Sequence, residues 1–501
     1  MDLEGLYLSF KREEILVGYP TKLWPNVETA CVTLRDKNET TLSTDEISNC
    51  IIVGAGQTGL TIAYGLKREQ INKVILLDEQ SKNITGPWST YARMEMLRTP
   101  KEQSGFDLGI PSLTFQAWYE AQYGQDSWNK LFRIPRKSWQ AYINWYRDVT
   151  GANVLNDTQV TDIEPIAIIN ASCKTESYIY KITAKANIDP SIVLYTRTVV
   201  IATGALGAGG AFIPESIKSA LPKKYYADVN EWPINFSRLK NKNVAIIGAG
   251  ASAFDVANEC LNSGARKAVV YARRLKMPLT NPRRWMEFSG FLANYPELDD
   301  LAKWRYMNYL QNIGQPPPEP TFLRSLRYEG FELQLGNERL NISLREGMVR
   351  LSSSRGIYDY DYLFSAAGFI TDLSSRDEFK TLYKDISLWG DHFSPPESLE
   401  NERLANYPYL GRFSQLTEKT KGAAPWLENI FIINRSSTLS MGPTAASISN
   451  VKYAARVVIS GVSRALFLSE SNSYYNNFLK SDHTEISDVK ILNYLSHTKE
   501  I

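Results

Sequence analysis

The chain has 501 residues, of which 43% are hydrophobic and 22% charged, and its 56 Lys and Arg nearly balance its 54 Asp and Glu. This balance excludes a strongly basic nucleic-acid-binding protein and an acidic disordered chain, and the length predicts two or three domains. The 11 Trp, 28 Tyr and 19 Phe are more than a disordered chain carries. They predict a large core, or flat walls for a planar cofactor.

The rarest residue types narrow the chemistry further. His392, His483 and His497 are the only histidines and are far apart, so we predict no metal site and no catalysis by a histidine cluster. The four Cys contain no Cys-x-x-Cys pair, which excludes a dithiol redox motif and predicts reduced thiols in a cytoplasmic protein. The first residues lack the apolar core of a secretory signal, and no stretch is apolar enough for a transmembrane span.

The first ordered unit is predicted after residue 47, since residues 1–47 have no clear period and are interpreted as an extension. The apolar run at 51–53 predicts a strand, residues 60–69 a helix, and residues 73–78 a second buried strand. The turn between the first strand and the helix contains Gly54, Gly56, Gln57, Thr58 and Gly59. This is the pattern of a β–turn–α unit that binds a dinucleotide.

Each residue type in this unit suits a contact with the dinucleotide. Gly54 permits the tight turn, Gly56 lets a pyrophosphate approach the backbone, and Gly59 permits close packing of helix on strand. The N–H groups at the start of the helix face the phosphates. Asp78, at the end of the second strand, is the expected acceptor for an adenosine ribose hydroxyl, and Glu79 is the alternative. An ordinary Gly-rich turn is the competing interpretation.

The rest of the chain repeats this arrangement. Residues 84–150 form an aromatic- and Arg-rich excursion with a helix at 134–149, and residues 153–201 form strands. A second unit then follows. Its predicted elements are a strand in the opening segment 243–250, a helix at 251–262, a strand at 268–274, helices within 281–330 and strands at 331–335 and 361–368. After this unit we predict a strand at 427–434, a helix at 442–468 and a polar tail from 469.

The second glycine turn predicts a different dinucleotide. It contains Gly248, Gly250, Ser252 and Ala253, with Ala in place of the third glycine. Its second strand ends in Arg273 and Arg274 rather than in an acid. An arginine pair at this place suits a 2′-phosphate, so we predict NADPH rather than NADH. The competing interpretation is a solvated strand end.

Two such units without a cysteine pair point to FAD first and NADPH second. On its motifs, the chain resembles the class B flavoprotein monooxygenases, the group of flavin-containing, Baeyer–Villiger and N-hydroxylating monooxygenases. The motifs are GAGQTG (54–59), GPW (86–88), ATG (202–204), GAGASA (248–253) and SAAG (365–368). Two departures weaken assignment to a subtype: residues 220–236 lack the family's fingerprint His, and residues 431–443 lack its terminal Gly-Asp.

The resemblance implies an α/β fold with two Rossmann-like domains, the second inserted into the first. The expected parts are an extension (1–47), an FAD-binding domain in two pieces (48–212 and 369–468, with the helical excursion 84–150), an NADPH-binding domain (213–368) and a tail (469–501). The resemblance also places further residues at the cofactors. These are Gly86, Pro87, Trp88, Val160, Ala202, Thr203, Gly204, Gly442 and Pro443.

Two of these predictions carry a physical argument. A helix beginning near Pro443 would direct its positive end at the N1/O2 edge of the flavin and stabilise the negative charge of the reduced ring. Arg93 and Arg98 lie near the family segment that places a polar residue over the flavin, so they are the candidate catalytic residues, holding oxygenated flavin or a substrate carboxylate. Phosphate contact or surface charge is the competing interpretation for both arginines.

Three functions remain compatible with these motifs. The first, implied by the resemblance, is a monooxygenase that uses FAD, NADPH and O2. Through a C4a-(hydro)peroxyflavin, it would insert one oxygen atom into a small-molecule amine, sulfide or ketone. The second is an NADPH-dependent flavin oxidase or reductase without oxygen insertion, and the third is a non-enzymatic flavin-binding protein. No nucleic-acid partner is expected, and the oligomeric state is left open between a monomer and a homo-oligomer.

Overall fold

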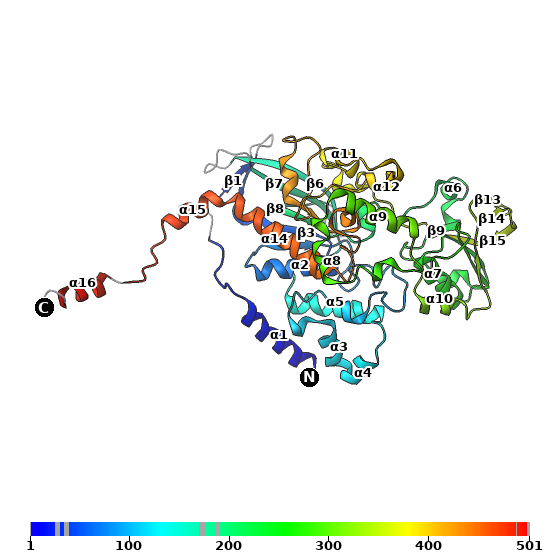
Figure 1. The fold of residues 1–501 in the computed structure, drawn as a ribbon, viewed down its shortest axis with the longest axis horizontal. Helices are drawn as coiled ribbons and strands as arrows, with labels where there is room; N and C mark the ends of the chain where they lie inside the picture. Colours follow the sequence, from blue (N-terminus) through cyan, green and yellow to red (C-terminus); the bar gives the residue numbers. More distant parts are fainter. Residues whose placement is uncertain are drawn as a thin grey trace.

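The computed structural model describes residues 2–25, 31–34, 40–169, 177–186, 191–486 and 488–497. Over these residues the strands form three sheets. Figure 1 shows the largest sheet, with β1, β3 and β6 to β8, in one lobe and β9 with β13 to β15 in the other. The C-terminal helices extend away from both lobes (Figure 1).

The largest sheet has a parallel half and an antiparallel half that meet at one strand. β8 pairs antiparallel with β7 but parallel with β3 and β17, which puts the mixed junction in the middle of the sheet. The order is β2-β1-β6-β7-β8-β3-β4-β5, with β17 against β8. The strands are β1 (Cys31–Leu34), β2 (Thr41–Ser43), β3 (Ile47–Val53), β4 (Val74–Leu77), β5 (Val154–Leu155), β6 (Thr158–Ile169), β7 (Ser177–Ala186), β8 (Ile192–Ile201) and β17 (Ile430–Ile432).

The second sheet is wholly parallel, and the chain enters it after β8 and leaves it before β17. This connectivity confirms the predicted fold class, two Rossmann-like units with the second inserted into the first. The order is β12 (Phe331–Gln334), β11 (Lys267–Tyr271), β10 (Asn243–Ile247), β16 (Tyr362–Ser365) and β9 (Tyr226–Asp228). A small antiparallel sheet is appended, made of β13 (Asn341–Arg345), β14 (Met348–Ser353) and β15 (Gly356–Tyr360).

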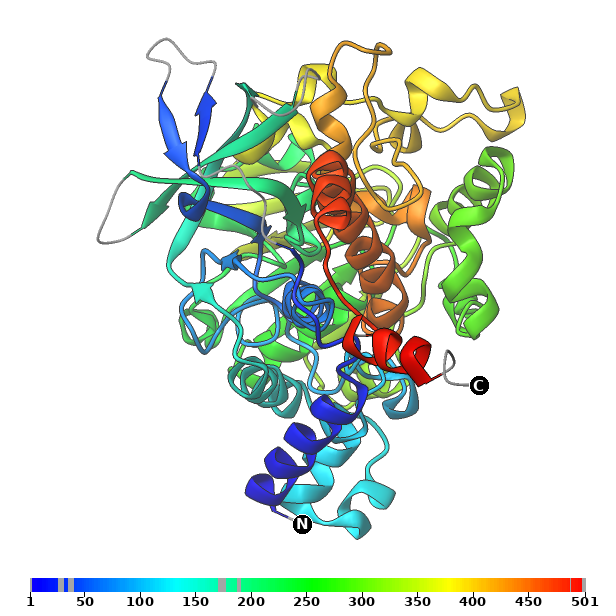
Figure 2. The same cartoon turned by 90° about the vertical axis from the view of Figure 1, so that its left-hand side faces the viewer.

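Helices cover both sheets. α2 and α14 pack against each other on the first sheet, and Figure 2 shows α14 crossing in front of it. The bounds are α1 (Leu3–Val17), α2 (Gln57–Arg68), α3 (Phe115–Tyr123), α4 (Gln125–Lys130), α5 (Arg136–Thr150), α6 (Glu215–Lys218), α7 (Ala251–Asn262), α8 (Ser289–Asn294), α9 (Asp300–Ile313), α10 (Glu319–Ser325), α11 (Trp389–His392), α12 (Glu402–Ala405), α13 (Thr438–Met441), α14 (Val451–Ser469), α15 (Ser471–Leu479) and α16 (Asp488–His497).

The start of the chain packs on the first lobe instead of standing apart from it. The carboxylate of Asp2 caps α1 by accepting a hydrogen bond from the Gly5 N–H, at 2.9 Å. One face of α1 buries Leu6 and Phe10, and the Phe10 ring lies 6.0 Å from that of Tyr64 on α2. The β1–β2 hairpin joins the large sheet through β6. The predicted extension therefore contributes to the core of the first domain.

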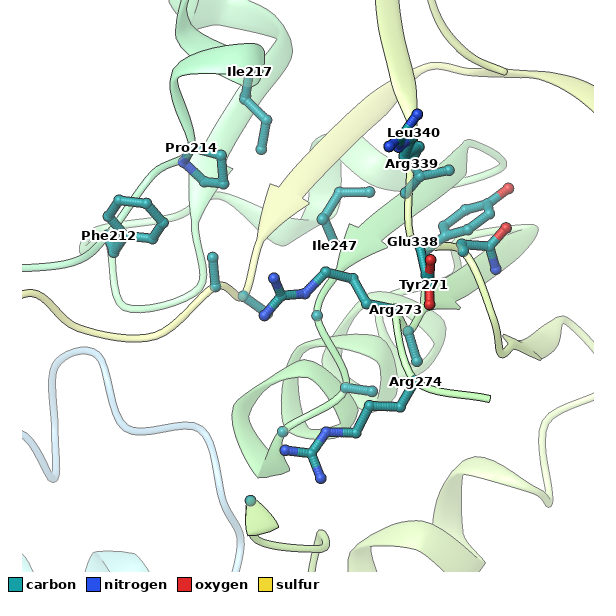
Figure 3. A pocket seen from close by; sticks show the side chains of 18 of the residues that line it. Phe212, Pro214, Ile217, Ile247, Tyr271, Arg273, Arg274, Glu338, Arg339 and Leu340 are labelled. Atoms are coloured by element: carbon teal, nitrogen blue, oxygen red, sulfur yellow. The ribbon is translucent and has the colours of Figure 1, made fainter. Parts of the chain in front are cut away.

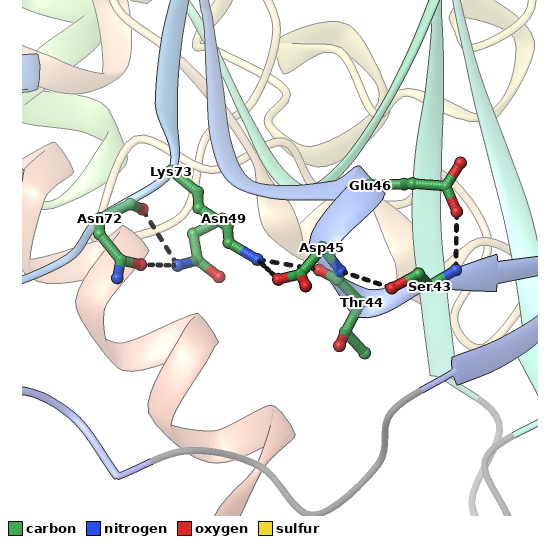
Figure 4. A network of polar contacts seen from close by, with 7 residues as sticks. All are labelled: Ser43, Thr44, Asp45, Glu46, Asn49, Asn72 and Lys73. Atoms are coloured by element: carbon green, nitrogen blue, oxygen red, sulfur yellow. Dashed lines mark hydrogen bonds and ion pairs between the residues drawn. The ribbon is translucent and has the colours of Figure 1, made fainter.

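A polar network fixes the short turn between β2 and β3 (Figure 4). Lys73, just before β4, makes an ion pair with Asp45 at 2.7 Å, and this contact lowers the pKa of the exposed Asp45 carboxyl. Nearby, the Asn49 side chain donates to the Asn72 carbonyl at 3.0 Å. These contacts hold the amino ends of β3 and β4 in register, and both strands lead into the segments of the first glycine unit.

The aromatic residues of the excursion are mostly core. Trp139, Tyr142 and Tyr146 of α5 are fully buried, and the Phe106 ring lies 4.5 Å from that of Tyr146. Offset and edge-on pairs of this kind add to the stability of a core. The excursion thus uses its aromatic surplus mainly for packing. Trp285 differs, because the residue is 62% exposed.

The predicted helix at 442–468 begins later than expected. Residues 442–450 form successive turns, and α14 starts at Val451. In these turns Ser447 donates its hydroxyl to the Thr444 carbonyl at 2.7 Å, a local bond that competes with helical pairing. The expectation of a helix starting near Pro443 is therefore wrong.

The tail from 469, expected to be merely polar, contains α15 and α16. None of the described helices is long and apolar enough to cross a membrane.

Candidate functional site

The two glycine units have the same geometry at the strand end. Gly54 and Gly248 have positive φ, +102° and +117°, which favours glycine. A Cβ on Gly54 would lie 2.6 Å from the Ala202 carbonyl oxygen, and one on Gly248 would lie 2.3 Å from that of Ala366. Each turn is thus packed against the motif that follows a later parallel strand, ATG in the first unit and AAG in the second.

The helices that follow the turns begin without a side-chain cap. Gly56 is the N-cap of α2 and Gly250 the N-cap of α7, and within the described residues no side chain accepts from the first N–H groups of either helix. By contrast, Asp299 caps α9 with its carboxylate. Uncapped N–H groups at a helix start, with the positive end of the helix dipole, are the donors that bind phosphate.

Space lies in front of both uncapped turns. A Cβ built on Gly56 meets only the Gly86 Cα, at 3.9 Å, and one built on Gly250 meets nothing within 4 Å. Gly59 differs, because a Cβ there would lie 2.0 Å from the Gly54 carbonyl oxygen. The structure therefore separates the roles expected for these glycines: Gly54 and Gly59 serve packing, while Gly56 and Gly250 line open space.

Asp78 is tied to the glycine turn itself. Its carboxylate accepts from the Ala55 N–H at 2.7 Å and from the Gln80 N–H at 2.8 Å, and burial raises its pKa. Glu79, the alternative acid, is exposed at the end of β4. Gln57 and Thr58, in the first turn of α2, are buried, and Gln57 accepts from the Trp139 indole N–H at 3.0 Å.

The GPW turn faces the first glycine turn. Gly86 has a φ of +81°, and its Cα is the nearest atom to a Cβ built on Gly56. Arg136, which the sequence did not single out, donates to the Trp88 carbonyl and thereby holds the turn. The indole Nε1 of Trp88 is buried and has no hydrogen-bond partner among the described residues. A buried donor without a partner is costly, so it marks a place for an acceptor.

The ATG motif and the segment after β17 complete this side of the site. The Ala202 N–H donates to the Val53 carbonyl at 2.8 Å, and the Asn434 amide donates to the Thr203 hydroxyl at 3.1 Å. The Gly204 carbonyl accepts from the Arg435 N–H at 3.3 Å. Segments far apart in the sequence thus meet at the carboxyl ends of β3 and β8.

The remaining first-domain residues flank this group. Gly442 has a φ of +117° and packs against Tyr295, and the Pro443 carbonyl accepts from Arg283 at 2.7 Å. Val160 is buried in β6 at a β-bulge. The β6 strand begins there, with the Thr158 N–H donating to the Asp78 carbonyl at 2.8 Å.

A cavity of about 690 Å³ opens at the second glycine turn. Figure 3 shows Phe212, Pro214 and Ile217 on one side of it and Arg339 with Leu340 on another. The lining also includes Gly248 and Gly250, whereas Ser252 and the buried Ala253 lie in the first turn of α7. The cavity is thus at the place expected for the second dinucleotide.

The two arginines predicted for a 2′-phosphate point in different directions (Figure 3). Arg274 donates to the carbonyls of Asn312 and Ile313 at the end of α9. Arg273 lines the cavity and, in the described part of the chain, has no hydrogen bond or ion pair. Arg339, which the sequence analysis missed because it lies in a different segment, lines the same cavity, likewise without such a partner in the described ranges.

Arg93 and Arg98 both connect the excursion to the second lobe. Arg93 donates to the carbonyls of Val229 and Glu231 after β9. Arg98 makes an ion pair with Asp255 on α7 at 2.7 Å, and Asp255 is almost fully buried. Burial lowers the pKa of Arg93 and raises that of Asp255. Both Nη groups of Arg93 are thus engaged by protein. Arg98 engages Nη2, whereas its buried Nε has no partner among the described residues, and the catalytic role of both arginines stays a prediction.

The residues present fit two dinucleotides. Two uncapped helix starts face open space, the Trp88 indole N–H lacks an acceptor within the described residues, and the cavity at α7 contains an unpaired Arg273. Among the described residues no group of His, Cys, Asp and Glu could hold a metal ion.

Comparisons with known proteins agree with this arrangement. A family model described as pyridine nucleotide-disulphide oxidoreductase matches residues 51–288. The FAD-dependent urate hydroxylase of Xanthomonas campestris pv. campestris is 36% identical over 439 residues, which cover 88% of this chain and 90% of that protein.

Solved structures show the same fold at low identity. Ornithine hydroxylase from Pseudomonas aeruginosa has a TM-score of 0.64 at 16% identity, covering 84% of this chain and all of that chain. L-lysine 6-monooxygenase from Pseudomonas syringae has a TM-score of 0.60 at 15% identity, with 84% of this chain and all of that chain covered. On its similarity to the urate hydroxylase over nine tenths of that protein, with both dinucleotide units in place, the chain belongs to the class B flavoprotein monooxygenases.

Proposed function

We propose that this protein is an FAD- and NADPH-dependent monooxygenase that hydroxylates a planar oxopurine such as urate. The observation that carries the proposal is the pair of uncapped glycine turns, one at the ATG motif and one at a cavity lined by Arg273, which has no partner among the described residues. The substrate class comes from the urate hydroxylase relative, which spans nearly the whole chain. It differs from the amine, sulfide and ketone substrates that the motifs suggested.

FAD is assigned to the first unit. Its pyrophosphate would bind at the start of α2 beside Gly56, and the isoalloxazine ring would lie toward Trp88 and Gly204. We assign the ribose contact to Glu79, because the Asp78 carboxylate already accepts two backbone N–H groups. Asp78 would then stabilise the turn that binds the cofactor.

NADPH is assigned to the second unit. Its pyrophosphate would bind at the start of α7 beside Gly250. Arg273 is the first candidate for the 2′-phosphate, with Arg339 as a second guanidinium lining the same cavity. Arg274 would instead stabilise the end of α9, where its donors are engaged.

When bound, FAD would supply the redox chemistry, accepting a hydride from NADPH and activating O2, which amino-acid side chains do not do. The chain itself binds and orients the reactants. Arg93 and Arg98 are proposed to be positioning residues, because they hold the excursion that contains the GPW turn against the second lobe. Arg136 similarly fixes the Trp88 carbonyl.

The test is a coupling measurement. The purified protein with FAD is mixed with NADPH and urate in air, and NADPH consumption is compared with hydroxylated product and with H2O2. A monooxygenase yields product close to the NADPH consumed, and urate accelerates the consumption. If every substrate tried, including amines and sulfides, leaves all consumption as H2O2, the protein is an oxidase and the proposal fails.

A further inference from the structure

Two arginines, Arg283 and Arg435, are each bonded to a turn of the proposed flavin site, and among the described residues neither has a carboxylate partner. Arg283 lies in a short turn between β11 and α8 and donates Nη1 to the Pro443 carbonyl at 2.7 Å. Arg435 follows β17, and its backbone N–H donates to the Gly204 carbonyl at 3.3 Å. Arg283 belongs by sequence to the inserted unit, but the segment that follows it packs with the first lobe, because Tyr295 and Trp304 share a core cluster with Trp389.

The charge of this pair is not balanced by the protein. Throughout the described ranges, neither guanidinium forms an ion pair with an Asp or Glu. The Arg435 guanidinium lies over the Phe369 ring at 4.8 Å, and Phe369 directly follows the AAG motif. Burial, together with the nearby positive charge of Arg435, lowers the pKa of Arg283. Two neighbouring cations in a partly desolvated place are costly unless an anion lies between them.

Some shielded arginines of this protein pair with a carboxylate, whereas Arg93 and Arg136, like Arg283, donate to backbone carbonyls. Arg98 pairs with Asp255, and Arg197 pairs with the buried Glu470 at 2.5 Å. Even Arg284, next to Arg283 in the chain, pairs with Glu287 at 3.3 Å. Arg283 differs from Arg93 and Arg136 because nearby Asp and Glu side chains raise the pKa of those two arginines, whereas none acts on the pKa of Arg283. Its charge is therefore available to a ligand.

The position of the pair also limits which ligand it serves. The dinucleotide phosphates have their own donors at the starts of α2 and α7, so they do not require these arginines. A guanidinium group is planar and presents parallel N–H donors, which match two acceptors on a flat, delocalised anion. The Phe369 ring adds a flat apolar surface beside Arg435.

We infer that Arg283 and Arg435 together bind the substrate as a planar monoanion, with urate as the probe. Urate has lost one proton at neutral pH and spreads the charge over its ring oxygens and nitrogens. The inference rests on the proposed function for the identity of the substrate, and it assigns two specificity-determining residues to that site. Both arginines would then contact the same ligand.

The inference is tested by calorimetric binding to the FAD-loaded protein. Urate and its neutral analogue 1,3,7,9-tetramethylurate are titrated into wild type, R283M, R435M and the control R284M. Each of R283M and R435M is expected to raise the Kd for urate roughly 10- to 100-fold, the loss typical of a charge-assisted contact. The Kd for the neutral analogue, the FAD content and the NADPH Kd are expected to stay unchanged, and R284M is expected to behave like wild type.

Several outcomes overturn the inference. It fails if wild type binds urate no more tightly than the neutral analogue, or if R283M and R435M leave the urate Kd unchanged. It also fails if the double variant R283M/R435M shifts the flavin reduction potential but leaves the Kd for urate unchanged. The two arginines would then stabilise the reduced flavin and not the substrate. R283K and R435K keep the charge but lose the planar fork, so an intermediate urate Kd is expected from them if a methionine variant does not fold.

These titrations, combined with the coupling measurement on the same variants, separate this inference from the proposed function. Arginine-dependent urate binding without hydroxylation supports the anion site and contradicts the reaction. Hydroxylation of urate with the same KM in wild type and R283M supports the reaction and contradicts the anion site.

Discussion

At the scale of single residues, neighbouring arginines of this protein have different partners. Arg273 and Arg274 are adjacent, were predicted as a unit and both line the second cavity, yet only Arg274 donates to the carbonyls at the end of α9. Sequence could place both at the end of β11, but the direction of each side chain depends on α9, which comes some 30 residues later in the chain. The pair therefore needs to be tested as two residues.

We predict that R273M raises the KM for NADPH roughly 10- to 100-fold and leaves the KM for NADH nearly unchanged, because only NADPH has the 2′-phosphate. R274M is the matched control. It is expected to lower the melting temperature while it changes both KM values little, since Arg274 donates to two carbonyls of α9. Steady-state kinetics with both nucleotides check this, and an equal effect of R273M on NADPH and NADH would refute 2′-phosphate recognition.

A second residue-scale prediction concerns pH. Burial raises the pKa of Asp228 to about 6, whereas an unfolded Asp titrates near ~3.9. Only the folded protein takes up this proton between pH 6 and pH 4, so the contribution of Asp228 to stability is greatest below pH ~4 and is lost as the pH rises through about 6.

The variant D228N should therefore be more stable than wild type at pH 8, by up to about 3 kcal/mol. Its amide oxygen can keep the acceptor role toward Asn230, and its NH2 replaces an oxygen that has no partner among the described residues. Unfolding by urea between pH 5 and pH 8 measures this. A variant with the wild-type pH dependence would show that Asp228 is not the group responsible.

At the scale of elements, the strand–turn–helix units were the best predicted parts of the chain. α7 spans the residues expected for it, because the glycine turn fixes where the helix starts. The start of α14 was misjudged, because the Ser and Thr residues before Val451 form local turns that an apolar pattern does not reveal. The contribution of α1 was missed for a similar reason: its buried Leu6 and Phe10 depend on contacts with α2 and the excursion.

The glycine units give a prediction that separates ligand binding from folding. G56V should fold with a near-normal melting temperature yet purify without the yellow of FAD, because a side chain there fills open space rather than protein. G250V should purify yellow and bind NADPH weakly. G59A is the opposite control: its Cβ would clash with the Gly54 carbonyl, so both stability and FAD binding should fall. A yellow, stoichiometric G56V protein would refute the placement of FAD.

At the scale of the whole molecule, the two lobes are joined by arginines of the excursion. Sequence placed Arg93 and Arg98 near the flavin by their distance from the GPW motif, but it could not reveal that Val229, Glu231 and Asp255 lie within their reach. Contacts between parts more than 100 residues apart leave no local pattern. The inserted topology was predictable because the same motif occurs twice, whereas the contacts between the lobes were not.

We predict that R98M lowers the unfolding free energy by about 2–3 kcal/mol, because it leaves the Asp255 carboxylate buried without its partner. The loss is below that of a wholly buried pair, since 35% of the Arg98 side chain is exposed. R98M combined with D255N should recover much of the stability, and with it the turnover, if Arg98 is a positioning residue. A stable double variant that stays inactive would instead support the catalytic role.

The most direct test of the central claim, oxygen insertion at a two-dinucleotide flavin site, is an isotope measurement. The FAD-loaded protein is supplied with NADPH, urate and ¹⁸O2 in ordinary water, and the product is analysed by mass spectrometry before it exchanges oxygen with solvent. The account predicts one ¹⁸O atom in each product molecule, with about one NADPH consumed for each. Product without ¹⁸O, or ¹⁸O recovered only as labelled H2O2, would contradict it.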